Sequence, residues 1–523
     1  MTHEPIAIVC IGCRLPGARD ARSLWNLLAR GIDAITQVPP ERWDLAAFYD
    51  PARVDDGKMS TRWGGFVAGV DRFDPQFFKI APREVPSMDP QQRVLLETVW
   101  EAMEDAGQRP EQLAGTATGV FIGMSSFDYS TLLVENKANI DAHFGSGNTN
   151  CIAANRISYL FDFRGPSLAV DTACSSSLVS VHLACRSLWA GDATLAIAGG
   201  VQLVLSPWGT VAYSKAGFMS PDGRCKAFDA SANGYVRSDG AGIVVLRPLA
   251  AALADNDRIY AVIRGSAVNQ DGRSNGLTAP NPAAQEAVLR AAYRDAGVSP
   301  ASVQYVEAHG SGTRLGDPIE MKSLAAVVGA GRAAGDLCAV GSIKSNIGHP
   351  EAAAGIAGLL KAALALRHGQ IPPSLHFETP NPYIPFDQIA LRVPTQLLPW
   401  PAEAAPPRAG VSSFGFGGTN VHMVLERAPA APPRAIHRAQ RPRHVLVLRA
   451  KTWRSLVDLA ASYRDFASAP EVDLADLCYS ANTGRSNFGH RLAVQAATTA
   501  ELRDELGAFV ADAHDGAAAT TPR

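Results

Sequence analysis

The chain has 523 residues, of which 47% are hydrophobic and 19% are charged, as is ordinary for compact globular proteins. This length predicts about three domain-sized units with ample chain for a large core. The formal net charge of -2 gives no electrostatic reason to expect binding to nucleic acid or to an anionic membrane surface. The N-terminus lacks a basic stretch before a long apolar run, and no run of about 18 apolar residues occurs. We therefore expect no signal peptide, no membrane span and a cytoplasmic location.

The 8 cysteines are scattered along the chain, which favours reduced cytoplasmic thiols over a disulfide framework. Cys10 and Cys13 form a C-x-x-C pair, which can serve redox chemistry or supply half of a zinc site. No second pair lies at zinc-site spacing, and Cys10 belongs to an apolar run. We favour a structural role for this pair and expect no bound metal.

Strand-like and helix-like segments alternate along most of the chain. Short apolar runs that predict strands are Ile6–Ile11, Gly119–Ile122, Leu195–Ala198, Ile243–Leu246, Tyr260–Ile263, Val303–Val306 and Val421–Leu425. Helical spacing of apolar residues occurs in Ser23–Leu28, Gln92–Ala106, Ala283–Ala296, Pro318–Val328 and Ala352–Arg367. This alternation predicts an α/β architecture with helices packed on sheets.

A composition change marks the end of this series. The segment Ala428–Pro442 is rich in Pro, Ala and Arg and predicts an extended linker. We therefore assign residues 1–426 to a large domain, 427–442 to the linker and 443–523 to a small α/β domain. The elements predicted for the small domain are His444–Leu448, Ser455–Phe466, Leu474–Asn482, Arg491–Ala496 and Ala500–Val510. We expect the final stretch GAAATTPR to be disordered or to continue into a longer chain.

The stretch VDTACSSSLVSVHLAC, Val170–Cys185, places a cysteine between a strand-like run and a helix-like one. The run ending at Val170 predicts a short buried strand, and Ser175 opens a segment with helical spacing. Cys174 would then lie at a helix N-terminus, where backbone N–H groups and the helix dipole favour a thiolate. Only about 3% of a thiol is ionised at pH 7 at its reference pKa, so a lowered pKa would increase its reactivity strongly. A small buried core cysteine is the alternative.

Two of the 12 histidines also lie in loops that follow strand-like runs. His309 lies in VEAHGSGTRLGDPIE, where Asp317 predicts the N-cap of the next helix. His349 lies in GSIKSNIGHPEAAAGIAGLLK, directly before a helix. Because α/β folds gather catalytic groups at such loops, these two are the candidate partners of the thiol.

A third glycine-rich segment is GVSSFGFGGTNVHMVLE, Gly410–Glu426. Its glycines allow close approach of the backbone to a ligand, and a tight turn before a strand explains them equally well. The sequence GRSNG, Gly272–Gly276, matches the serine-hydrolase motif G-x-S-x-G, but it lies in a polar loop and not between a strand and a helix. We therefore set a serine hydrolase aside.

Four segments in fixed order, VDTACSSSLV, EAHGSGTRLGDPIE, KSNIGHPEAAAG and SFGFGGTNVH, resemble the ketosynthase domain of type I polyketide synthases, in the thiolase-like β-ketoacyl synthase superfamily. The resemblance runs from about Pro5 to Glu426, and the segment after the linker resembles the small unit that joins ketosynthase to acyltransferase. It implies a thiolase-like five-layer αβαβα fold of two similar halves, with a small C-terminal α/β linker domain.

The same resemblance implies decarboxylative Claisen condensation of a Cys-bound acyl chain with a malonyl-type extender. Both substrates would arrive on the phosphopantetheine arm of an acyl carrier protein, so that the chain itself binds no cofactor. A homodimer, and an acyltransferase acting in cis or in trans, are further implied partners.

The resemblance also assigns roles to the candidate residues. Cys174 would carry the acyl chain, and the backbone N–H groups of Cys174 and Phe416 would form the oxyanion hole. His309 and His349 would stabilise the enolate, and Lys344 would hold His309 and add positive potential. The residues expected along the pantetheine arm and the acyl pocket are Ser311, Thr313, Phe414, Phe416, Gly417 and Gly418, with Phe416 as the gate.

Some positions depart from the family pattern. Ser311 stands for a usual Thr, Cys10 for a usual Gly, Pro350 for Thr or Leu, and Ser238-Asp239 for Gly-Glu. None of these changes removes a catalytic group. We expect the carboxylates Asp317 and Glu320 to anchor the following helix rather than to act in the chemistry. The intact cysteine and histidines favour an elongating ketosynthase over a non-elongating or scaffold domain that only transacylates or docks carrier protein.

Overall fold

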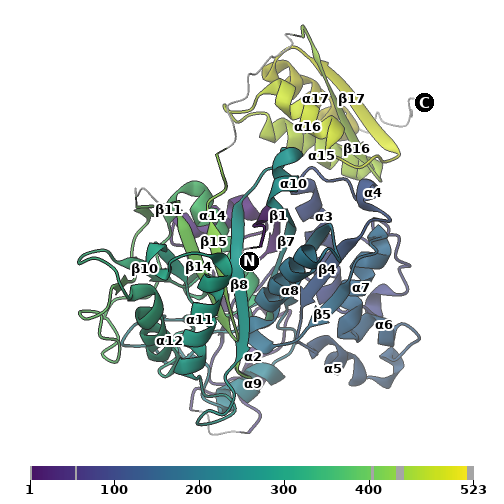
Figure 1. Ribbon diagram of the computed structural model, residues 1–523. Coiled ribbons are helices and arrows are strands. Elements are labelled where there is room, and N and C mark those ends of the chain that lie inside the picture. Colours follow the sequence, from purple (N-terminus) through teal and green to yellow (C-terminus); the bar gives the residue numbers. More distant parts are fainter. Residues whose placement is uncertain (1–2, 53–55, 402–405, 431–440, 515–523) are drawn as a thin grey trace. The chain divides into compact units, whose positions relative to one another are not determined.

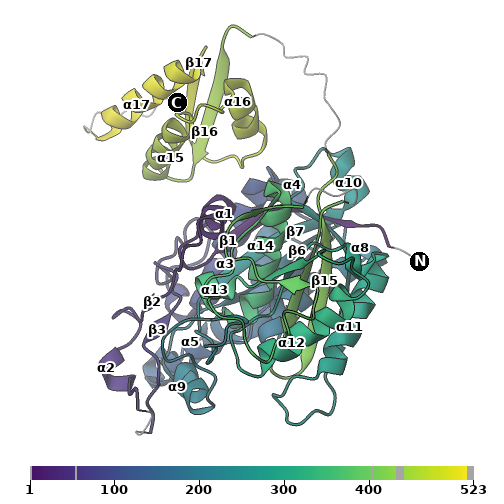
Figure 2. The same ribbon diagram turned by 90° about the vertical axis from the view of Figure 1, so that its left-hand side faces the viewer.

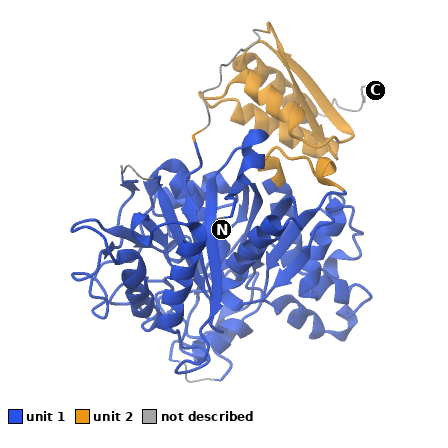
Figure 3. Ribbon diagram, viewed as in Figure 1, with its two compact units in different colours: residues 1–102, 115–429 blue, residues 103–114, 430–523 orange. Residues whose placement is uncertain are grey.

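The computed structural model describes residues 3–52, 56–401, 406–430 and 441–514. The chain divides into two compact units, one of residues 1–102 and 115–429 and one of residues 103–114 and 430–523 (Figure 3). The second unit thus includes residues 103–114, which we had assigned to the large domain. Most of the predicted linker and the stretch GAAATTPR lie outside the described residues.

An 11-stranded sheet forms the centre of the first unit (Figures 1 and 2). Its strands are β1 (Ile6–Arg14), β4 (Thr118–Gly123), β5 (Ser167–Val170), β6 (Leu195–Gln202), β7 (Gly240–Pro248), β8 (Ala261–Gln270), β9 (Tyr305–Glu307), β10 (Cys338–Gly341), β12 (Leu391–Arg392), β14 (Arg408–Phe414) and β15 (Thr419–Glu426). Two small sheets pair β2 (Thr36–Gln37) with β3 (Trp63–Gly64) and β11 (Gln370–Ile371) with β13 (Leu398–Pro399).

Helices surround and separate the strands. They are α1 (Ala21–Ala29), α2 (Leu45–Phe48), α3 (Pro90–Asp105), α5 (Asp128–Val134), α6 (Phe144–Asn148), α7 (Asn150–Phe161), α8 (Ser176–Ala190), α9 (Trp208–Lys215), α10 (Leu249–Ala254), α11 (Pro282–Ala296), α12 (Gly316–Leu324), α13 (Lys344–Ile347) and α14 (Ala354–His368). The strands and helices predicted for this part of the chain are present, but some differ in extent. Strand β8 continues to Gln270 beyond its predicted end at Ile263, and α12 ends at Leu324, where a π-helical turn follows.

The large sheet consists of two halves with the same connectivity. The strand order is β5-β4-β6-β7-β1 in the first half and β10-β9-β14-β15-β8 in the second. In each half the second strand pairs in parallel with both neighbours, and the pairs that follow are antiparallel. The halves join where β1 pairs with β8 over three residues. This repeat confirms the predicted fold of two similar halves.

Helices α8 and α14 follow the equivalent strands β5 and β10 and pack on each other between the halves. Each residue of α14 from Ala354 to Leu366 is buried, because this segment is apolar on nearly all sides. Helix α7 packs on β4 and β5, and α11 packs on β8 and β15. The five layers are therefore outer helices, half-sheet, α8 with α14, half-sheet and outer helices.

The N-terminal ends of α8 and α14 approach each other closely. The Ser177 hydroxyl accepts the backbone N–H of Ile356 at 3.0 Å, so α8 satisfies one of the free donors at the start of α14. A Cβ atom at Gly355 would lie 2.5 Å from Cβ of Leu178, closer than such atoms can approach. Only glycine permits the observed separation of the two helices.

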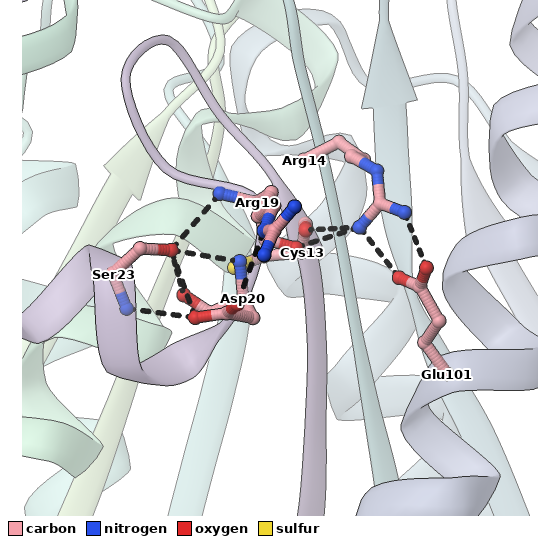
Figure 4. A network of polar contacts seen from close by, with 6 residues as sticks. All are labelled: Cys13, Arg14, Arg19, Asp20, Ser23 and Glu101. Atoms are coloured by element: carbon pink, nitrogen blue, oxygen red, sulfur yellow. Dashed lines mark hydrogen bonds and ion pairs between the residues drawn. The ribbon is translucent and has the colours of Figure 1, made fainter. Parts of the chain in front are cut away.

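A hydrogen-bonded network fixes the start of α1 (Figure 4). The Ser23 N–H donates to Asp20 Oδ1 at 2.7 Å, and the Asp20 N–H donates to Ser23 Oγ at 3.1 Å, which is a reciprocal cap. Arg14 at the end of β1 donates to the Arg19 carbonyl at 2.6 Å and forms an ion pair with Glu101 of α3. These contacts tie β1, α1 and α3 together.

The strand before the cysteine differs from its prediction. We expected a buried strand, but β5 is the last strand of the sheet, and Leu168 is 47% exposed. Its apolar residues are typical of a strand with a neighbour on each side, but among the described residues β5 pairs with β4 alone.

The second unit is a small α/β domain with its own core. Its elements are α4 (Pro110–Leu113), β16 (His444–Ala450), α15 (Trp453–Phe466), α16 (Leu474–Thr483), β17 (His490–Ala496) and α17 (Thr499–His514). Strands β16 and β17 pair antiparallel along their whole length, and Leu446, Leu456 and Leu502 are fully buried between the sheet and the helices. Arg485 donates to the Glu104 carbonyl at 3.0 Å, which explains why residues 103–114 belong to this unit.

No helix among residues 3–52, 56–401, 406–430 and 441–514 has both the length and the apolar character needed to cross a membrane.

We predict that Gly355→Ala lowers the free energy of unfolding by about 1–3 kcal/mol, because the added methyl group forces α8 and α14 apart. Gly145→Ala is the matched control, since a Cβ at this helical position meets nothing within 4 Å. Urea denaturation of both variants measures the difference. Equal stability of the two variants would contradict the tight contact.

Candidate active site

A cavity of about 600 Å³ lies beside the N-terminal ends of α8 and α14. The predicted site residues that line it are Cys174, His309, Ser311, Thr313, His349, Phe414 and Phe416. The structure thus brings together four segments that are far apart in the sequence. Lys344, Gly417 and Gly418 are not among the described residues that line this cavity.

The turn that carries Cys174 is tight and well anchored. Ala173 has φ 56, a left-handed conformation that is uncommon outside glycine. The Ser176 hydroxyl accepts the N–H of Thr172 at 2.9 Å and donates to the Ala173 carbonyl at 2.6 Å. Ser413 donates its hydroxyl to the Cys174 carbonyl at 2.8 Å. Hydrogen bonds within the turn and one from β14 therefore hold the cysteine between β5 and α8.

The loop between β14 and β15 packs directly on this turn. A Cβ at Gly415 would lie 2.3 Å from the Thr172 carbonyl oxygen, so the close contact requires glycine. The backbone N–H of Phe416 interacts with the sulfur of Cys174, while the Phe416 side chain is 48% exposed. Gly418 has φ 88 and closes the turn through its N–H to the Gly415 carbonyl at 2.8 Å. The glycines thus form a tight turn that packs closely on the turn of Cys174, and a role in ligand binding stays a prediction.

The thiol is protonated in the resting site. Burial raises the pKa of Cys174 to about 12, and the negative charge of Glu351 adds to this effect. Lys344 and the backbone N–H groups of Phe416 and Cys174 act in the opposite direction and do not outweigh burial. The lowered pKa that we expected from the helix N-terminus is therefore wrong, because desolvation is the larger effect.

Both imidazoles use the same ring nitrogen, Nδ1, as a hydrogen-bond acceptor. His309 Nδ1 accepts the N–H of Phe414 at 3.3 Å, and His349 Nδ1 accepts the N–H of Glu351 at 3.0 Å. Since each Nδ1 is an acceptor, each neutral ring carries its proton on Nε2. Burial, with Lys344 as the next cause, holds both pKa values well below the ordinary range. The two ring centroids are 5.5 Å apart, and both Nε2–H groups are hydrogen-bond donors.

The backbone of His309 is held from two sides. Lys344 Nζ donates to the His309 carbonyl at 2.5 Å. The Glu320 carboxylate accepts the N–H of His309 at 2.7 Å and that of Gly310 at 2.8 Å. Lys344 therefore contacts the backbone of His309, and Glu320 anchors the loop that carries this histidine to α12.

Asp317 does not cap the helix as predicted. Helix α12 begins at Gly316 with Leu315 in the N-cap position. The Asp317 carboxylate instead accepts the N–H of Phe228 at 2.7 Å and that of Gly312 at 3.1 Å. The carboxylate therefore ties the glycine-rich loop to a distant segment, which sequence spacing could not show.

Two hydroxyl groups lie near each other on the cavity wall. Ser311 Oγ and Thr313 Oγ1 are 3.3 Å apart, and Ser311 is 7% exposed. Both positions come from the loop after β9, which also carries His309. Hydroxyls at this place can bind the amide groups of an extended polar ligand.

Several residues of the site were missed from the sequence. Tyr213, Tyr235 and Glu351 line the cavity, and the rings of Tyr235 and His349 are 4.9 Å apart. Arg237 forms a buried ion pair with Glu351 behind them. The proximity of Glu351 to His349 in the chain is a signal for one of these residues, and nothing in the local pattern indicates the others.

Within the described ranges, no group of three or more His, Cys, Asp and Glu side chains could hold a metal ion. The predicted C-x-x-C pair lies in β1, where both cysteines are fully buried.

Family profiles match consecutive parts of the chain. The β-ketoacyl synthase N-terminal domain matches residues 3–252, and the β-ketoacyl synthase C-terminal domain matches residues 260–378. The ketoacyl-synthetase C-terminal extension matches residues 380–493.

Two solved structures are similar over almost the whole chain. The ketosynthase from module 6 of the bacillaene synthase of Bacillus subtilis is 40% identical, with a TM-score of 0.88, over 97% of this chain and 85% of that one. The oxazolomycin ketosynthase domain of Streptomyces albus is 39% identical, with a TM-score of 0.91, over 97% of this chain and 89% of that one. The chain belongs to the β-ketoacyl synthase family, as a ketosynthase of the polyketide synthase type.

Curated relatives are larger proteins. A phenolphthiocerol/phthiocerol polyketide synthase of Mycobacterium bovis is 52% identical over 97% of this chain and 28% of that protein. A phenolphthiocerol/phthiocerol polyketide synthase of Mycobacterium tuberculosis is 50% identical over 98% of this chain and 33% of that protein. The chain thus spans a third or less of the length of these relatives.

We predict that alkylation of Cys174 by iodoacetamide accelerates about tenfold per pH unit up to at least about pH 10, because desolvation raises the pKa of this partly exposed thiol to about 12. Peptide mass spectrometry measures the rate, and the exposed Cys151 serves as an internal reference for an accessible thiol. A plateau below about pH 8.5 would instead demonstrate a lowered pKa.

Proposed function

We propose that the chain catalyses decarboxylative Claisen condensation between an acyl chain on Cys174 and a malonyl-type extender. Both would arrive on the phosphopantetheine arm of an acyl carrier protein. The observation that carries the proposal is that a thiol and two neutral imidazoles, each with its proton on Nε2, line one cavity. This combination provides a nucleophile and two donors for a developing negative charge.

The first step is acyl transfer to the cysteine. Cys174 Sγ attacks the thioester carbon of the acyl carrier protein, and the bond from that carbon to the pantetheine sulfur breaks. The proton of the Cys174 thiol ends on the released pantetheine thiol. The backbone N–H groups of Cys174 and Phe416 stabilise the tetrahedral oxyanion, and the loss of one such donor typically costs about 3 kcal/mol.

The second step is decarboxylation and carbon–carbon bond formation. The bond between the α-carbon and the carboxylate of the malonyl thioester breaks, the carboxylate leaves as CO2, and the electron pair of the bond passes into a thioester enolate. The Nε2–H groups of His309 and His349 donate to the enolate oxygen and lower the barrier. The enolate carbon then attacks the carbonyl carbon of the Cys174 thioester and forms the new carbon–carbon bond, and the cysteine leaves as a thiolate that takes a proton from solvent water. Lys344 supports the step by fixing His309 and adding positive potential.

The remaining predicted residues suit the pantetheine arm and the acyl chain. Ser311 and Thr313 offer hydroxyls on the cavity wall to the pantetheine amides. Phe416 is half-exposed on a glycine-rich turn, as a gate requires, and Phe414 lies behind it against the His309 ring. Gly417 and Gly418 contribute by shaping this turn rather than by lining the cavity.

Partners follow from the same chemistry. An acyl carrier protein would deliver both substrates, and an acyltransferase, in cis or in trans, would load the extender. A second copy of the chain is a further partner, because β5 is an edge strand with an exposed Leu168, and Tyr159 of the adjacent α7 is 84% exposed. Edge strands with apolar side chains readily pair with another chain.

We predict that Cys174→Ala abolishes covalent acylation, whereas His349→Ala retains acylation and loses condensation by about 10²–10³-fold. Mass spectrometry of the intact protein measures acylation, and chromatography of the β-ketoacyl carrier protein measures condensation. Acylation without product in the wild-type protein would favour a domain that only transacylates, and the absence of any adduct would favour a scaffold.

We predict that Leu168→Asp converts a dimer into a monomer, since it places a charge on the apolar edge strand. Light scattering after gel filtration measures the molar mass. Leu277→Asp, at an 88% exposed position outside β5 and α7, is the matched control and should leave the mass unchanged. A dimer that survives the first substitution would place the interface elsewhere.

A further inference from the structure

A buried ion pair lies beside His349 and takes no part in the steps above. Arg237 Nε is 2.6 Å from Glu351 Oε1, and Nη2 is 2.9 Å from Oε2. The two side chains are 6% and 12% exposed. Replacement of a buried ion pair by apolar residues of similar size is often neutral or stabilising, so stability alone is a weak reason for the pair.

The segment around Arg237 and the one around Glu351 both hold His349. The His349 N–H donates to the Val236 carbonyl at 2.7 Å, and the Ser238 N–H donates to the His349 carbonyl at 3.0 Å. On the other side, the Glu351 N–H donates to His349 Nδ1 at 3.0 Å. The last bond determines which nitrogen of the ring carries the proton, so it depends directly on where the backbone of Glu351 lies.

That backbone position requires an external restraint. Glu351 has φ 37, a conformation that costs free energy for a residue other than glycine. The bidentate contact with Arg237 supplies the restraint. Arg237 is itself fixed, because it donates to Thr210 Oγ1 at 3.2 Å and lies over the Tyr213 ring at 5.3 Å from its centroid.

The charges of Arg237 and Glu351 also affect the pKa values of His349 and Cys174. Glu351 is the charged group that most raises the pKa of Cys174. The positive charge of Arg237 lies against this carboxylate and, after burial, Lys344 and His309, helps to lower the pKa of His349. Loss of Arg237 alone would leave a buried negative charge beside a site where negative charge develops.

We propose that Arg237 is a positioning residue for condensation: its bidentate contact with Glu351 holds the Glu351 N–H against His349 Nδ1, and so keeps the Nε2–H of His349 available to the enolate. The proposal rests on the function proposed above. It assigns the ion pair to the decarboxylation and condensation step and not to acylation of Cys174.

The test separates positioning from stability with the double variant Arg237→Met/Glu351→Met, which removes both charges and leaves neither unpaired. We expect a melting temperature close to that of the wild type and acylation within about threefold of it. Condensation should fall about 10–100-fold, the usual effect of a slightly misplaced catalytic group. Arg408→Gln is the matched control, because it removes another partly buried ion pair, Arg408–Glu426 at 2.8 Å. The side chains of this pair are 17% and 15% exposed, and Arg408 lies at the end of β14 remote from Phe414.

Two results would overturn the proposal. One is a double variant that condenses at the wild-type rate, and the other is an equal loss of acylation and condensation. Glu351→Gln keeps an acceptor for Arg237 and should retain most of the condensation, which checks the result without a change in side-chain shape. Wild-type protein that acylates but forms no β-ketoacyl product would overturn the proposed function itself, and this proposal with it.

Discussion

The close approach of two helix N-termini governs the rest of this structure. Gly355 lets α14 come so near to α8 that a Cβ would collide with Leu178, and Ser177 of α8 caps α14 through Ile356. Each helix is preceded by a short turn, η3 (Ala173–Ser175) and η6 (Glu351–Ala353). Because the halves repeat the same connectivity, these turns are equivalent, and their meeting brings the thiol to the histidine.

The two turns share an unusual backbone conformation. Ala173 before the cysteine and Glu351 after the histidine both adopt left-handed conformations. Such conformations persist only where the surroundings over-determine them. In the first turn, Ser176 and its hydrogen bonds supply that support, and in the second the ion pair with Arg237 does so.

Burial sets the protonation states that the chemistry uses. Desolvation raises the pKa of Cys174 and lowers those of His309 and His349, so the resting site is a neutral thiol beside two neutral imidazoles. Neutral rings with their protons on Nε2 are suited to donate to an enolate and not to bind a cation. Lys344 stays close enough to bias the site toward negative charge, while its own contact is with a backbone carbonyl.

Much of the fold and the three central residues could be predicted from the sequence. Cys174, His309 and His349 each follow a strand-like run and precede a glycine-rich loop or a helix, and the apolar pattern of α14 is unmistakable. The ion pair of Arg237 with Glu351 could not be predicted, because the two residues are 114 positions apart and no local sequence periodicity relates them. The pKa of Cys174 was misjudged because helix position is visible in a sequence whereas depth of burial is not. The exposure of Leu168 was misjudged because an apolar run looks the same in the sequence whether its strand lies inside a sheet or at its edge.

The most direct measurement of the central claim is the ¹⁵N NMR spectrum of the protein labelled at histidine. Substitution of His309 and of His349 in turn would assign the ring nitrogens. The account predicts that both rings are neutral at pH 7 with the proton on Nε2 and that they stay neutral at the pH where an exposed histidine becomes half protonated, since their pKa values lie well below the ordinary range. A proton on Nδ1 of either ring, or an imidazolium at pH 7, would contradict it.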